Sequence, residues 1–156
     1  MDGKEAFIAL NFKGIQHFSP DEFDYPEKMD RLTLQMVDAM RDIEGHRRHI
    51  IITINCDYVP RARGGHAPNS MHYWGKAIDC VIRDARTREP LPIMEQFLIA
   101  LRYHWTGIGF YPFWDDPGLH LDTRTGTRFL PRALWWQDEH GKYKPIEEYF
   151  GQGREV

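Results

Sequence analysis

Two short segments alternate apolar and polar residues, and this alternation constrains the fold more than any other feature of the sequence. In AIDCVI (77–82) Asp79 interrupts an apolar run, and in LHLDTR (119–124) His120 and Asp122 alternate with leucines. Because successive residues of a strand face opposite sides of a sheet, each segment is predicted to be a strand with one apolar face. If the two strands are neighbours on a shared core, their polar side chains project together from the other face.

Other segments complete the predicted elements. The segment 49–55, HIIITIN, is rich in β-branched residues and is predicted to be a buried strand. A second helix is expected over 92–104 and another short strand over 106–112. A first helix is predicted over 30–44, ending at Gly45, from apolar residues at helical spacing: Met29, Leu32, Met36, Met40 and Ile43.

The order of these elements predicts a small α+β fold, with a central antiparallel sheet flanked by helices. The chain has 156 residues, of which 42% are hydrophobic, enough to bury one core, so residues 1–156 are expected to form a single domain. The segment 57–70, with two prolines and a Gly-Gly pair, is predicted to be a loop. The tail, 130–156, is rich in aromatic residues without a clear period and is expected to wrap over the core.

The charge and hydropathy of the sequence argue against several classes of binding partner. The chain has 20 basic and 23 acidic residues with both signs scattered, which argues against binding to nucleic acid or to an anionic membrane. The sequence shows neither a signal peptide nor an apolar run long enough to insert into a membrane, so we expect a protein made in the cytoplasm. We also expect a monomer. Two cysteines, Cys56 and Cys80, are too few for a disulfide scaffold, and we expect both to be buried free thiols. If the two strands that carry them are neighbours, a single disulfide is the alternative.

Three side chains could meet on the polar face of the predicted sheet. His72 lies at the turn that leads into the strand carrying Asp79, and His120 lies on the other alternating strand. Two imidazoles and one carboxylate are typical of a catalytic zinc site, which leaves a fourth position for water or substrate. The lack of a nearby cysteine pair argues against a closed structural zinc site, and the few loop carboxylates argue against calcium.

The residues around these ligands resemble the motifs of a known family. SMHYWGKAID (70–79) resembles the S-x-H-x-x-G-x-A-x-D motif of the zinc peptidases that cut the peptide part of bacterial cell walls. These are the D-alanyl-D-alanine carboxypeptidases, the L-alanyl-D-glutamate endolysins and their hedgehog-fold relatives. GIGFYP and GLHLD, within 107–122, resemble the second motif, and the likeness extends over about 20–124. The resemblance implies a hedgehog/DD-peptidase-like fold and Zn²⁺ bound by His72, Asp79 and His120.

The resemblance also implies a function. We expect a zinc-dependent peptidase that hydrolyses peptide bonds of peptidoglycan, with the choice between carboxypeptidase and endopeptidase left open. Its partners would be peptidoglycan peptides, and a phage-encoded enzyme delivered by lysis or as a virion component would fit. One alternative is a catalytically degenerate metal-binding module that recognises cell-wall peptides or a partner protein. Another is an amidase or esterase that acts outside the wall.

Two departures from the family pattern affect the remaining site residues. Relatives carry an S-G-Y-R sequence after the first strand, and its arginine is thought to hold the substrate; here Arg61 or Arg63 could substitute, and Arg63 is the predicted substrate contact. Several relatives have an acidic residue three positions before the last ligand, where this chain has Pro117. Asp116 is therefore the predicted general base.

Three further residues complete the expected site. Asp122, which shares a face with His120, is predicted to orient a ligand from outside the metal sphere, with the base role as its alternative. Ser70, two residues before His72, is predicted to support the ligand set in the same indirect way. Of the remaining histidines, His66 lies on the loop that approaches the site and is a candidate for substrate contact.

Overall fold

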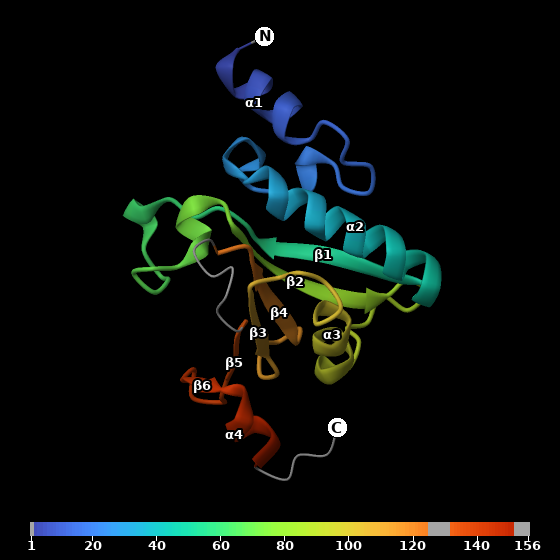
Figure 1. Cartoon of the computed structure of the whole chain (residues 1–156), viewed down its shortest axis with the longest axis vertical. Helices are drawn as coiled ribbons and strands as arrows, with labels where there is room; N and C mark the ends of the chain where they lie inside the picture. The colour runs from blue at the N-terminus through green and yellow to red at the C-terminus, as the bar shows by residue number, and fades with distance from the viewer. Residues whose placement is uncertain (1, 125–131, 152–156) are drawn as a thin grey trace.

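A computed structural model describes residues 2–124 and 132–151 as helices packed on one six-stranded sheet (Figure 1). The strands lie in the order β1-β2-β4-β3-β5-β6, and every neighbouring pair is antiparallel except the parallel pair β3–β5. The predicted small single-domain α+β fold is thereby confirmed. The strands are β1 (Ile50–Cys56), β2 (Ala77–Asp84), β3 (Gly107–Tyr111), β4 (Gly118–Asp122), β5 (Ala133–Gln137) and β6 (Tyr143–Pro145). The helices are α1 (Gly3–Asn11), α2 (Arg31–Arg48), α3 (Ile93–Ala100) and α4 (Ile146–Gly151).

Helix α2 differs from its prediction in both its end and its buried face. It begins where the Asp30 side chain accepts a hydrogen bond from the backbone N–H of Thr33, and it continues past Gly45 to Arg48. A single glycine costs a helix only about 1 kcal/mol, and packing offsets that cost. The residues that α2 buries against the sheet are chiefly Leu34, Val37 and Met40, whereas Leu32 and Ile43, which we expected to be buried, are exposed.

The two strands that carry Asp79 and His120 are neighbours, which was the condition for these side chains to share a face. Strands β2 and β4 are antiparallel neighbours, and Asp79 lies directly opposite His120. Their apolar residues enter one core with residues of α2 and α3, including Ile78, Cys80, Leu119 and Leu121. Because residues alternate along each strand, Asp79 and His120 face the other side of the sheet, away from these helices. None of the described helices is both long and apolar enough to span a membrane.

The tail adds to the sheet instead of only wrapping over the core. Strand β5 extends the sheet beside β3, β6 pairs with β5, and α4 follows. The Tyr149 ring of α4 packs edge-on against Phe110 of β3 and Trp136 of β5, with ring centroids 4.8 and 5.1 Å apart. The prediction missed these strands because they are short. Residues 130–131 and 152–156 of the predicted tail lie outside the described residues.

Candidate metal centre

A short turn positions His72 at the start of β2. The turn is η4 (Met71–Trp74), and the Ser70 hydroxyl accepts a hydrogen bond from the backbone N–H of His72. Gly75 ends the turn with φ of 66°, and a Cβ at this position would lie 2.0 Å from the backbone oxygen of Lys28. Only glycine avoids both the backbone strain and this clash. The serine and glycine of the 70–79 motif therefore fix where His72 points.

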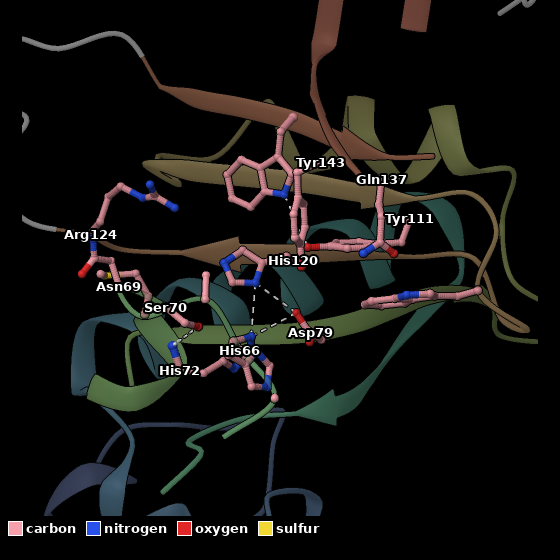
Figure 2. Close-up of a pocket in the computed structure, with 15 residues that line it drawn as sticks. His66, Asn69, Ser70, His72, Asp79, Tyr111, His120, Arg124, Gln137 and Tyr143 are labelled. Carbon is pink, nitrogen blue, oxygen red and sulfur yellow. Dashed lines mark hydrogen bonds and ion pairs between the residues drawn. The ribbon is translucent and has the colours of Figure 1, made fainter. Parts of the chain in front are cut away.

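Three predicted ligand atoms converge on one point above the sheet. Nε2 of His72 lies 3.2 Å from Oδ1 of Asp79 and 3.2 Å from Nδ1 of His120. Nδ1 of His120 lies 3.0 Å from the same Asp79 oxygen. Figure 2 shows the two imidazoles and the carboxylate directed toward one another. The structure thus brings together residues that are 7 and 48 positions apart in the sequence.

The hydrogen bonds on the outer side of each imidazole show which ring nitrogen carries the hydrogen and which directs a lone pair toward the other two side chains. Nδ1 of His72 lies 2.6 Å from the backbone oxygen of Asp57, which can only accept, so Nδ1 carries the hydrogen. Nε2 of His120 likewise donates to the Asp122 carboxylate, 3.0 Å away. In their neutral forms, both histidines therefore direct lone pairs toward a carboxylate oxygen. Three negative or lone-pair atoms at this spacing repel one another unless a cation lies between them.

The spacing and the chemistry of the three atoms suit a metal ion. Tetrahedral zinc, with bonds of about 2.0–2.1 Å, holds its nitrogen and oxygen ligands about 3.3 Å apart. The separations here, 3.0 to 3.2 Å, are within a few tenths of an ångström of that value. A second grouping overlaps the first: ligand atoms of Cys56, His72 and Asp79 all lie within 4.8 Å of one another and could hold a metal ion. The tighter set contains His120 in place of Cys56.

The pKa values of His72, His120 and Asp79 reflect the close approach of these three side chains. Burial disfavours the charged form of His72, but the hydrogen bonds to Asp79 and Cys56, together with the charge of Asp79, outweigh it and raise the pKa of His72 to about 9. For His120, burial is again outweighed, here by hydrogen bonds to Asp122 and Asp79, and its pKa also rises to about 9. Burial opposes ionisation of Asp79, yet the two histidines hold its pKa well below the usual range. Without a metal, the two histidines bind protons. A metal ion must displace these protons in order to bind.

A second carboxylate supports His120 from behind, as predicted for Asp122. Its Oδ1 and Oδ2 accept hydrogen bonds from Nε and Nη2 of Arg124, and its Oδ2 also accepts the bond from His120. Burial would raise the pKa of Asp122, but these bonds from Arg124 and His120 hold it far below the usual range. Gly107 on the neighbouring strand makes room, because a Cβ there would lie 2.3 Å from Asp122 Oδ2. An ionised carboxylate thus orients the His120 ring.

The three ligand residues lie in a pocket of about 480 Å³, within the range of small-ligand sites. In Figure 2 Asn69 and Ser70 lie on one side of the candidate ligands and Tyr111 and Gln137 on the other, while His66 lies against His72 and Tyr143 lies above His120. The predicted loop thus contributes to the site, as do Tyr111 and Trp114 beside the second motif. Sequence reasoning missed Gln137 and Tyr143; the short alternation Trp135–Trp136–Gln137 was the only available signal.

Neither Asp116, the predicted general base, nor Arg63, the predicted substrate contact, lines the pocket. Asp116 does not line the pocket; its carboxylate is 52% exposed and forms an ion pair with Arg83 at 2.6 Å. It lies in the loop between β3 and β4, of which Trp114 lines the pocket and Asp116 does not. Arg63 is exposed and lies outside the pocket lining. Among the arginines that the structure describes, Arg124 is the one that lines the pocket.

Neither protein-family models nor curated protein sequences give a match to this chain. The functional argument therefore depends on the geometry of the site and on the sequence motifs that form it.

Proposed function

We propose that this protein is a zinc-dependent peptidase that hydrolyses peptide bonds in bacterial peptidoglycan. The observation that carries the proposal is the convergence of His72 Nε2, Asp79 Oδ1 and His120 Nδ1 within 3.2 Å of one another in a pocket. Two imidazoles and a carboxylate favour zinc over calcium or magnesium, which prefer oxygen ligands. The similarity of residues 70–79 and 107–122 to the motifs of cell-wall peptidases supports peptidoglycan as the substrate.

The surrounding residues have definable roles. Zinc, when bound, supplies a Lewis acid that polarises the scissile carbonyl and lowers the pKa of a coordinated water. The Asp57 carbonyl and the Asp122 carboxylate hold the two imidazoles in the tautomers that ligation requires. Amide side chains of Asn69 and Gln137 line the pocket and suit hydrogen bonds to the peptide groups of a substrate.

Proton transfer is assigned to His66 in place of Asp116. Among the described residues with carboxyl or imidazole side chains that line the pocket, His66 is the one outside the ligand set. Its ring centroid lies 4.6 Å from that of His72, and the Tyr73 hydroxyl donates a hydrogen bond to its backbone oxygen. Burial lowers the pKa of His66, which favours the neutral base. We expect this imidazole to accept a proton from the attacking water and deliver it to the leaving nitrogen.

Digestion of purified peptidoglycan tests the function. The zinc-loaded protein is expected to release peptide products, the metal-stripped protein to release none, and added zinc to restore the release. Chromatography of the products separates a carboxypeptidase, which releases single amino acids, from an endopeptidase, which releases larger fragments. Binding to peptidoglycan without release by the zinc-loaded protein would instead indicate a binding module. Equal cleavage of unrelated L-peptides would indicate a general amidase.

A further inference from the structure

The end of β1 contains an irregularity that turns Cys56 toward the metal centre. Ile54 pairs with Cys80, and after a one-residue register shift Cys56 pairs with Asp79. In a regular strand Ile54 and Cys56 would face the same side, but the extra residue, Asn55, reverses this relation. Ile54 therefore packs on the core, whereas Cys56 shares a face with Asp79. Cys80, the other cysteine, is fully buried on the core side.

The Cys56 sulfur lies close to the ligand set and makes only weak contacts. Sγ is 3.8 Å from Nδ1 of His72 and 3.9 Å from the backbone oxygen of Asp57. Its distances to the ligand atoms of His72 and Asp79 in the metal-capable group are no more than 4.8 Å. Nδ1 is the outer nitrogen of His72, so the 4.8 Å limit within the metal-capable group is the separation that matters for ligation. A change of the single χ1 rotamer moves a cysteine sulfur by about 3 Å, which is on the scale of the separations in this group.

We propose that the Cys56 thiolate occupies the fourth coordination position of the metal when no substrate is bound. The inference rests on the proposed metal centre, with His72, Asp79 and His120 as the other ligands. Thiolate sulfur is a favourable ligand for zinc, and a coordinated thiol loses its proton. The centre is then closed at rest, and substrate or water must displace the sulfur before hydrolysis begins. Cys56 thus regulates access to the site without being needed for the chemistry.

Cobalt(II) substitution tests this directly, because cobalt reports its own ligands. A thiolate ligand adds a charge-transfer absorption in the near ultraviolet, whereas the visible bands report binding through any ligands. The wild-type protein is expected to show both, and Cys56→Ala to keep the visible bands but lose the ultraviolet absorption. Cys80→Ala is the matched control, since it removes the other thiol, and it is expected to keep both. Circular dichroism verifies that each variant is folded.

The possible failures are distinguishable. If cobalt and zinc do not bind at all, the proposed metal centre and function fail. If cobalt binds but Cys56→Ala has the wild-type spectrum, only the role of Cys56 is overturned. Alkylation of Cys56 in the wild-type protein provides a measurement that needs no variant. Zinc is expected to slow the reaction with iodoacetamide at least 10-fold, and an unchanged rate would contradict sulfur ligation.

Discussion

The His120→Ala variant is expected to lose both zinc binding at stoichiometric metal and hydrolysis. The substitution removes one of three protein ligands and leaves Asp122, which is fully buried, without its histidine partner. The loss of affinity should exceed the 10- to 100-fold that removal of an outer hydrogen-bond partner typically costs. Zinc affinity is measured by competition with a chromophoric chelator, and turnover by product release from peptidoglycan.

Two further variants give reference values for the zinc affinity of His120→Ala. His104→Ala removes an exposed histidine outside the pocket and is expected to bind zinc like the wild-type protein. Asp122→Asn keeps the ligand set but weakens the support of His120, so its affinity should lie between the other two. Because Cys56, His72 and Asp79 could still hold a metal ion in His120→Ala, a zinc affinity equal to that of the wild-type protein is the result that would contradict the assignment of His120.

The second large effect is expected at His66. His66→Gln should retain zinc but lower kcat by about 10²- to 10⁴-fold, the usual contribution of general acid–base catalysis. Glutamine keeps much of the size and hydrogen-bonding capacity of the side chain but cannot carry the proton. Zinc content and kcat, measured on the same preparation, separate a loss of proton transfer from a loss of metal.

The pH profile provides an independent check of the same role. Burial lowers the pKa of His66, so its neutral base form persists below the ordinary histidine value of about 6.5. Wild-type kcat/KM should therefore hold at neutral pH and fall only below that value, and His66→Gln should lack this acidic limb. Asp116→Ala is the control and should keep near-normal rates, because Asp116 is paired with Arg83 outside the pocket. Rates within twofold of wild type for His66→Gln would contradict the assignment.

The fold was predictable wherever a strand alternates or runs through the core. Alternation around Asp79 and His120 identified both strands and the face they share, because a strand period of two ties side-chain direction to position. The helix end at Gly45 was not predictable, since packing determined whether the glycine interrupted the helix. The parallel pairing of β5 with β3 depends on contacts between distant segments, for which a five-residue strand carries too little information.

The candidate site likewise has residues whose positions the sequence predicted and residues whose positions it did not. The convergence of His72, Asp79 and His120 was predictable because these residues lie on or beside regular strands and within motifs of fixed spacing. Cys56 was expected to be buried with the core, but a one-residue bulge moved it to the polar face and left it partly exposed. Asp116 was selected for its nearness in sequence to His120, but a loop can turn a side chain away within four residues. Such local backbone changes leave little trace in the sequence.

Anomalous X-ray diffraction at the zinc edge, from crystals of the zinc-loaded protein, tests the central claim most directly. The account predicts one strong peak per chain, about 2.0–2.2 Å from Nε2 of His72, Nδ1 of His120 and a carboxylate oxygen of Asp79. No peak among these three residues, or zinc bound only at surface histidines, would contradict it.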